Sequence, residues 1–346
     1  LYIDHMLGAG QGSIAAGGVV DRQPPGRAEP GRRPVPRPPV WLTRLPSLFS
    51  RSRSMAPMDV LVAGGTGFVG SHLCRELAER GHDVTAFART PGDADLPDGV
   101  ATERGDVTVP GDVRDAVEGA DAVVNLVSLS PLTRPAGGEE MHDRVHRAGT
   151  ENLVDAAEAA GVDRFLQMSG IHADPAGPTP YLRAKGRAEE IVRESALDHV
   201  IVRPTTVFGD GDEIVPFVRK VAPPYLTPLP GGGRTRFQLV WIDDLTPMLA
   251  DAVDDDAHVG RTYEIGGPDV LTLAQIAQMI HRADGRSSTV VPVPMALAGV
   301  GMTVGQYLPG FPFGPAQYES LKMDLVTGDN DLDAFGVDPA DLRTFA

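Results

Sequence analysis

The sequence predicts an α/β protein built on a doubly wound parallel sheet, followed by a smaller mixed α/β portion. From residue 58 onward, short apolar runs alternate with stretches of helical periodicity. The first run ends in a glycine-rich turn, and glycines also follow three of the predicted helices, as they do at helix C-termini. Strands that alternate with helices in this way pair in parallel and are covered by helices on both faces.

The expected elements follow one another along the chain. We expect strands at 60–63, 84–88, 122–127, 164–168 and 199–202, a short strand before Gly105, and helices near 68–80, 111–119, 139–160 and 181–196. After Arg203-Pro204 come a Pro/Gly-rich stretch at 223–233, a strand at 237–242 and mixed short segments to about 330. We expect some of these later segments to return to the first sheet.

Residues 1–54 differ in composition from the rest of the chain. They contain eight prolines and eight arginines but only three acids. Such a segment has too little apolar surface to fold, and its X-Pro pairs exclude regular helix, so we expect it to be disordered. It also lacks the uninterrupted apolar or amphipathic run of a targeting peptide. Because Met55 and Met58 directly precede the first strand, we expect the native protein to begin at one of them.

The charge balance is acidic, with 47 Asp and Glu against 31 Lys and Arg, a net charge of −16 and only three lysines. This balance argues against nucleic acid and anionic lipid as partners. It favours a source adapted to high salt, where repulsion between carboxylates is screened. The single cysteine, Cys74, allows no disulfide within the chain, which fits a reducing cytoplasm.

The glycine-rich turn lies between the first strand and the first helix. Gly64, Gly67 and Gly70 are spaced by three, while Gly65, Gly67 and Gly70 fit the form G-x-G-x-x-G, so spacing leaves the subtype open. Such a turn lets bare backbone approach a pyrophosphate, and the helix N-terminus supplies N–H donors. We therefore predict that a nicotinamide dinucleotide contacts Gly64, Gly65, Thr66, Gly67, Phe68, Val69 and Gly70.

The end of the second strand bears on the choice between NAD and NADP. The acid that would bind the ribose 2′-hydroxyl of NAD is replaced here by Ala88, followed by Arg89. A guanidinium can bind a 2′-phosphate bidentately, so this position favours NADP(H) over NAD(H), with a solvated loop arginine as the alternative. Asp106 could accept from the adenine amino group. Other strand ends add Val107, Asn125, Leu126 and Val127 to the predicted site.

Tyr181 and Lys185 are the candidate catalytic pair. Residues four apart share one face of the helix that Pro180 opens, so we expect the ammonium to lie beside the phenol. That charge would lower the pKa of the phenol and make Tyr181 a proton shuttle to or from a carbinol. Lys185 can also hold the nicotinamide ribose. Tyr318 and Lys322 have the same spacing, but we expect them on a helix surface far downstream.

Four motifs occur in order along the chain. They are Gly64-x-x-Gly67-x-x-Gly70, Gly149-Thr150-Glu151-Asn152-Leu153, Tyr181-x-x-x-Lys185 and Arg203-Pro204-Thr205-Thr206-Val207-Phe208-Gly209. As a set they resemble the short-chain dehydrogenase/reductase superfamily, in its extended or atypical epimerase/dehydratase branch, over about residues 58–280. The Tyr-Lys segment together with Arg89 resembles more closely the NADPH-binding accessory subunit of respiratory complex I and its prokaryotic relatives.

The resemblance implies a domain organisation and a function. We expect an NAD(P)-binding Rossmann domain over 55–203 with Pro204 at its cofactor site, a substrate-binding portion over 204–330, and a tail over 331–346. One expected function is a reductase, epimerase or dehydratase that acts on a carbonyl or secondary alcohol. The alternative is a non-catalytic NADPH-binding subunit peripheral to a respiratory assembly at the cytoplasmic membrane. Pairing of helices in many relatives makes a homodimer a further expectation.

One departure from the family pattern concerns the catalytic hydroxyl. The family's Ser/Thr lies at the end of the fifth strand, where this chain has Gly170. Ser169 is one residue early, and a one-residue shift on a strand points a side chain to the opposite face. Because strand ends bend, Ser169 stays in the predicted catalytic set with Tyr181 and Lys185.

Two further segments have more than one interpretation. His146 stands where the family usually has an asparagine, and with His142 it is expected to form a packed or solvated pair rather than a zinc site. The apolar segment 291–313 contains four prolines and several glycines. We expect it to form a buried lid over the site, and a docking surface for a membrane partner is the alternative.

Overall fold

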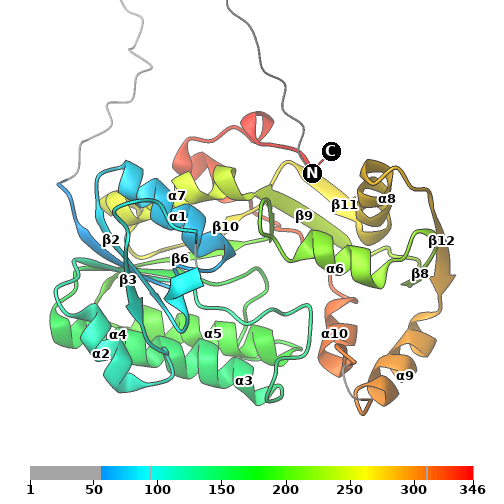
Figure 1. The fold of residues 1–346 in the computed structure, drawn as a ribbon, viewed down its shortest axis with the longest axis horizontal. Helices are drawn as coiled ribbons and strands as arrows, with labels where there is room; N and C mark the ends of the chain where they lie inside the picture. Colours follow the sequence, from blue (N-terminus) through cyan, green and yellow to red (C-terminus); the bar gives the residue numbers. More distant parts are fainter. Residues whose placement is uncertain (1–55, 94, 309–310, 346) are drawn as a thin grey trace, which may run out of the picture. The chain divides into compact units, whose positions relative to one another are not determined.

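The computed structural model describes residues 56–93, 95–308 and 311–345. The predictions for residues 1–54, and the proposed start at Met55, fall outside these residues. A seven-stranded sheet with the order β10-β6-β5-β4-β1-β2-β3 forms the centre of the described chain (Figure 1). All its pairings are parallel, which confirms the predicted sheet class. The strands are β1 (Asp59–Ala63), β2 (Asp83–Ala88), β3 (Ala101–Arg104), β4 (Ala122–Asn125), β5 (Arg164–Met168), β6 (Asp198–Pro204) and β10 (Arg261–Ile265).

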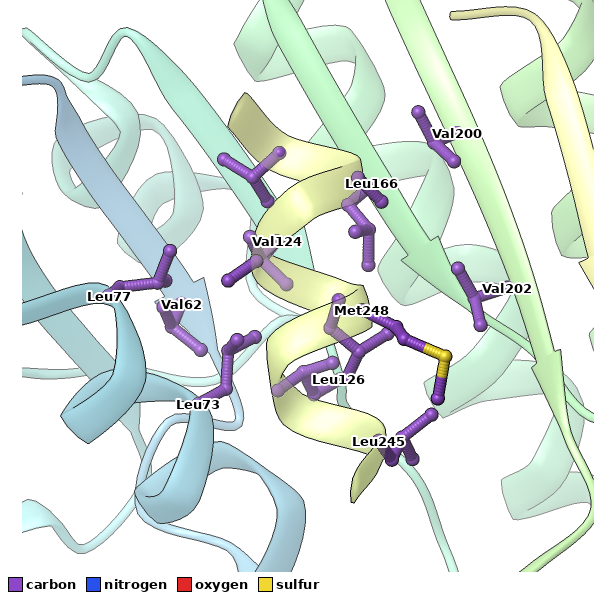
Figure 2. Close-up of a cluster of buried hydrophobic side chains, with 14 of the residues drawn as sticks. Val62, Leu73, Leu77, Val124, Leu126, Leu166, Val200, Val202, Leu245 and Met248 are labelled. Carbon is purple, nitrogen blue, oxygen red and sulfur yellow. The ribbon is translucent and has the colours of Figure 1, made fainter. Parts of the chain in front are cut away.

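Helices cover both faces of this sheet because its strands are apolar on both sides. Along β1, Val60 and Val62 belong to one core, while Leu61 and Ala63 belong to the other. The helices α1 (Phe68–Glu79) and α7 (Ile242–Asp254) cover the first face, where their side chains meet those of the strands (Figure 2). The second face is covered by α2 (Pro110–Val117), α4 (Gly149–Ala160) and α5 (Pro180–Glu194). A short helix α3 (Glu140–His142) and a π-helical stretch (Asp143–Ala148) lead directly into α4.

The strand order of the central sheet indicates where a ligand binds. The neighbours of β1 are β2 on one side and β4 on the other, so the chain reverses its direction of travel across the sheet between them. In open parallel sheets, ligands bind beyond the carboxyl ends of the strands at such a point. The glycine turn after β1, the segment after β2 and the loop after β4 all start at this edge.

The chain after β6 adds a third core and also returns to the central sheet. β10 and α7 belong to the central layers although they follow residue 203. The third core lies between two small sheets and two helices. These elements are β7 (Thr206–Phe208), β8 (Tyr225–Pro230), β9 (Arg236–Trp241), β11 (Asp269–Thr272), β12 (Ser288–Val293), α6 (Ile214–Val221) and α8 (Leu273–Ala283).

The apolar segment after β12 is not a buried lid, so that expectation is wrong. It forms α9 (Met295–Gly305), which is followed by α10 (Pro315–Ser320). Leu297, Val300 and Val304 on α9 are each 62% exposed. In Figure 1 both helices extend away from the layers of the central sheet. None of the helices in the described part of the chain combines the length and hydrophobicity that a bilayer span needs.

Candidate functional site

The glycine turn after β1 is shaped for close approach of a ligand. Gly64 has φ +83°, which favours glycine, and its turn leads into Gly67 at the N-cap of α1. A Cβ on Gly70 would lie 2.1 Å from the Gly64 carbonyl oxygen, so only glycine lets the helix pack this closely on the turn. A Cβ on Gly65 would lie 2.7 Å from the Cβ of Ala86. The turn therefore has the geometry that a dinucleotide pyrophosphate requires.

The N-terminus of α1 is suited to an anion. Its first turn has no acidic side chain, and no side chain caps it. The first intrahelical bond runs from the N–H of Ser71 to the carbonyl of Gly67 (2.9 Å). The preceding N–H groups and the helix dipole are thus directed at the cavity in front of the turn.

This first cavity has a volume of about 240 Å³ and brings together residues from four strand ends. Eight of the predicted cofactor residues line it: Gly64, Thr66, Gly67, Arg89, Asp106, Val107, Leu126 and Val127. The site prediction omitted seven others: Phe87, Ala88, Thr90, Gly105, Ser128, Leu129 and Val145. Most of these adjoin predicted residues in sequence. Val145 comes from the π-helical stretch, and no sequence signal pointed to it.

Arg89 and Asp106 present polar groups to this cavity. Arg89 is exposed and forms no ion pair with any other described residue. One carboxylate oxygen of Asp106, Oδ1, accepts the N–H of Thr108 at 2.9 Å. Oδ2 is the oxygen of Asp106 that remains to accept from a ligand such as an adenine amino group.

The other predicted cofactor residues do not line the first cavity. Asn125 is buried, and its amide donates to Thr150 Oγ1 (3.0 Å) and Gln167 Oε1 (2.9 Å) and accepts the Val127 N–H (3.2 Å). It therefore fixes the loop after β4 from behind. Gly65 and Gly70 pack under the turn, while Phe68, Val69 and Pro204 line a second cavity.

The second cavity, with a volume of about 300 Å³, lies beside the first and shares Ser128 with it. Thr179 and Tyr181 line it at the beginning of α5, and Gly170 lines it just after the end of β5. Thr179 caps that helix, because its hydroxyl accepts the N–H of Leu182 (3.2 Å), and Pro180 fits the first helical position. The start of α5 thus places the phenol next to the junction of the two cavities.

The environment of Tyr181 contradicts the expected lowering of its pKa. Burial raises the pKa of Tyr181 to about 12; the neighbouring Ser128 side chain lowers it, and the charge of Glu213 raises it. The ring packs edge-on against His142 and His146, with ring centroids 5.7 and 5.3 Å away. Desolvation therefore outweighs the attraction of any nearby cation, and the phenol keeps its proton at neutral pH.

Lys185 is 2% exposed, and its Nζ donates to the Met168 carbonyl oxygen at 3.0 Å. Burial lowers the pKa of Lys185 to about 8, against the opposing effect of the Glu189 carboxylate. The ammonium thus contacts the end of β5, whereas the sequence predicted that it would contact the phenol of Tyr181. Together with burial, its charge lowers the pKa of His142 to about 4, so that imidazole is neutral at pH 7.

Gly170 stands where the family's catalytic hydroxyl would be. A Cβ on Gly170 would lie 3.4 Å from the Tyr181 hydroxyl oxygen. Ser169 does not line either cavity, and its buried hydroxyl has no hydrogen-bond partner among the described residues. Ser128 lines the second cavity together with Tyr181, and its Oγ donates to the Leu129 carbonyl oxygen at 3.3 Å. The loop that carries it is held by His146, whose Nε2 accepts the Leu129 N–H at 3.3 Å.

Three comparisons with known proteins agree with this geometry. A family model described as NAD(P)H-binding matches residues 64–221. The chain is 30% identical, over 81% of its own length and 73% of the relative's, to the mitochondrial NADH dehydrogenase [ubiquinone] 1 alpha subcomplex subunit 9 of Arabidopsis thaliana. It is 32% identical to the 2-alkyl-3-oxoalkanoate reductase of Stenotrophomonas maltophilia, over 66% of this chain and 76% of the relative.

The fold is also that of known sugar-modifying enzymes. The dTDP-glucose 4,6-dehydratase DesIV of Streptomyces venezuelae, solved with NAD and TYD bound, superposes with a TM-score of 0.59 at 23% identity. The match covers 68% of this chain and 84% of that one. Three observations lead to one conclusion: the glycine turn has no room for larger residues, a cavity lies at the switch point of the sheet, and these relatives match the chain. The chain belongs to the NAD(P)H-binding short-chain dehydrogenase/reductase superfamily.

Proposed function

We propose that the protein is an NADP(H)-dependent reductase that converts a carbonyl to a secondary alcohol, or the reverse, with Tyr181 as its acid/base. The observation that carries this proposal is the position of Ser128 in the walls of both cavities, with Tyr181 beside it. A dinucleotide in the first cavity would extend toward this junction. A substrate carbonyl in the second cavity would meet it there.

The protonation state of Tyr181 suits the reductive direction. When bound, the dinucleotide supplies a hydride to the carbonyl carbon, and the carbonyl oxygen then needs a proton. A phenol with a pKa of about 12 is protonated at neutral pH and can donate to that oxygen as negative charge develops on it. In oxidation of the alcohol, the deprotonated form of Tyr181 would accept the hydroxyl proton, and the hydride would pass to the oxidised dinucleotide.

Ser128 and Lys185 take supporting roles in this proposal. Ser128 would donate to the substrate carbonyl and so replace the hydroxyl that Gly170 lacks. Lys185 lines neither cavity, and its Nζ donates to the Met168 carbonyl, so in this proposal it would hold the end of β5 beside the second cavity. Both roles would fix the reacting atoms before the proton moves.

The preference for NADP(H) is supported by Arg89. Its guanidinium lines the first cavity, and the end of β2 carries Ala88 in place of an acid. Arg89→Ala should weaken NADPH binding by about tenfold to a hundredfold and NADH binding by less than about threefold, since a charged hydrogen bond contributes about 1.5–3 kcal/mol. Calorimetric titration with both nucleotides measures this, with the exposed Arg75→Ala as control. An equal loss for both nucleotides would remove the phosphate contact.

A second candidate function is a non-catalytic NADPH-binding subunit of a respiratory assembly. Two observations favour it: Gly170 supplies no hydroxyl, and α9 exposes Leu297, Val300 and Val304. One relative is named as a subunit of NADH dehydrogenase. Purification at high salt, followed by a search for bound nucleotide and by assays of NADPH consumption with carbonyl compounds, separates the two. Consumption supports the reductase, and a tightly held nucleotide that no carbonyl consumes supports the subunit.

A further inference from the structure

The wall of the second cavity is made mostly of hydrocarbon. Segments far apart in the sequence contribute the side chains of Leu132, Ile171, Ile214, Phe237, Met323 and Leu325. Its volume of about 300 Å³ falls at the lower end of the range for small-molecule sites. Such a wall binds a ligand chiefly by removing its apolar surface from water.

The charges of the wall exclude a large class of ligands. Among the described residues that line the cavity there is no lysine, arginine or histidine, and Glu213 is the one carboxylate. Three cations next to lining residues in sequence are paired: Arg236 with Asp324 (2.8 Å), Lys322 with Glu319, and Arg203 with Glu189 (2.6 Å). Arg183, next to Leu182, donates to the Gly177 carbonyl oxygen (2.9 Å) and does not line the cavity. Proteins bind phosphates and carboxylates with such cations. An anion in this cavity would lose hydration and gain a repulsive neighbour.

Glu213 lines the same cavity as Tyr181. It occupies the N-cap position of α6 and is exposed. Its charge reaches the phenol, because it contributes to the raised pKa of Tyr181. A substrate whose carbonyl meets Tyr181 would therefore also lie within the field of this carboxylate.

We propose that the substrate is an uncharged ketone, or the matching secondary alcohol, with hydrocarbon attached to the carbonyl carbon, and that Glu213 excludes anionic substrates. The inference rests on the reductase function proposed above and adds the class of ligand that the site accepts. The proposed substrate class differs from that of the structural neighbour of Streptomyces venezuelae. The substrate in that enzyme's name, dTDP-glucose, carries a diphosphate that the described wall has no cation to bind.

The test is a series of ligands added to the NADPH complex of the full chain. Straight-chain methyl ketones of increasing length are compared with 3-oxo carboxylates of matched length, by calorimetric Kd and by kcat/KM. Affinity should rise about threefold to fourfold per methylene that the wall covers. Each ketone should bind at least about tenfold more tightly than its matched carboxylate. A preference for the carboxylates, no dependence on length, or no binding of any ketone overturns the inference.

Glu213→Gln tests the excluding group. It should improve the binding of the carboxylates about threefold to tenfold and leave the ketones within about twofold, since only the repulsion is removed. Glu79→Gln, an exposed substitution on α1, is the matched control and should change neither. If the difference in affinity between ketones and matched carboxylates is the same in Glu213→Gln as in wild type, the role of Glu213 is overturned. Ketones that bind but are never reduced contradict the reductase alone, whereas reduction that favours anions contradicts the substrate class alone.

Discussion

The chain contains two Tyr-x-x-x-Lys segments, and they differ in almost every physical respect. Tyr181 and Lys185 lie on α5, with Lys185 2% exposed and bonded to the Met168 carbonyl. Tyr318 lies on α10, which ends at Ser320, so Lys322 is beyond the helix. The Lys322 ammonium sits 5.0 Å from the centre of the Tyr318 ring and pairs with Glu319.

The difference shows that spacing alone does not make a site. Four residues on a helix bring two side chains to one face, but only the first pair opens a helix at the carboxyl edge of the parallel sheet. There, burial changes the pKa of both groups. The second pair is a cation–π contact between a half-buried tyrosine and an exposed lysine, worth about 0.5–1 kcal/mol.

Replacing each tyrosine with phenylalanine should give the largest difference in kcat between the two pairs. Tyr181→Phe removes the proton donor and should lower kcat for ketone reduction by about 10²- to 10⁴-fold. Tyr318→Phe keeps its ring and should leave kcat within about twofold. Steady-state NADPH consumption measures both. Comparable rates in wild type and Tyr181→Phe would refute the assignment of the acid.

Removal of the Ser128 hydroxyl should have the next largest effect on kcat. Ser128→Ala should lower kcat by about 10²-fold, by analogy with removal of an oxyanion-hole donor. Adding Gly170→Ser should restore part of that loss, because a Cβ at this position makes an ordinary contact of 3.4 Å with the Tyr181 hydroxyl. Ser130→Ala, which changes another lining hydroxyl, is the control. If the double variant is no faster than Ser128→Ala, the two hydroxyls are not interchangeable.

The two lysines should differ in how stability depends on pH. The pKa of Lys185 is about 8 in the folded protein and 10.5 as its ordinary value, so between these values the unfolded chain binds more protons. Stability therefore rises with pH across this window, by about 2 kcal/mol from pH 8 to pH 10. The raised pKa of Tyr181 acts in the opposite sense only from about pH 10 upward.

Denaturant unfolding of three proteins checks this dependence. Relative to wild type, Lys185→Met should lose the rise between pH 8 and pH 10, while Lys322→Met should keep it. The same slope in all three proteins would mean that Lys185 is not held in a desolvated position.

Much of the fold could be predicted from the sequence because its signals are local. The apolar run at 60–63, the glycine turn and Pro180 each fix an element through periodicity or backbone restriction. The cofactor cavity was predictable in part for the same reason, since strand ends meet at one edge. Asn125 shows the limit of that inference. It lies at the predicted strand end, but its amide donates to Thr150 and Gln167 and is not free to bind the cofactor.

The features that depend on burial were not predictable. Sequence spacing suggested that Lys185 lowers the pKa of Tyr181, but the packing of His142 and His146 around the phenol desolvates it instead. The apolar character of α9 suggested a buried lid, yet its leucine and valines face solvent. Which face of an apolar helix is covered depends on elements distant in sequence, and the segment 291–313 has no charged residues to mark an outer face.

Calorimetric titration of the full chain with NADPH, in low salt and in molar KCl, tests the central claim most directly. The account predicts binding of one nucleotide per chain, tighter for NADPH than for NADH, with a raised melting temperature. No heat and no change in melting temperature with either nucleotide, in both salts, would contradict the claim that the turn from Gly64 to Gly70 holds a dinucleotide.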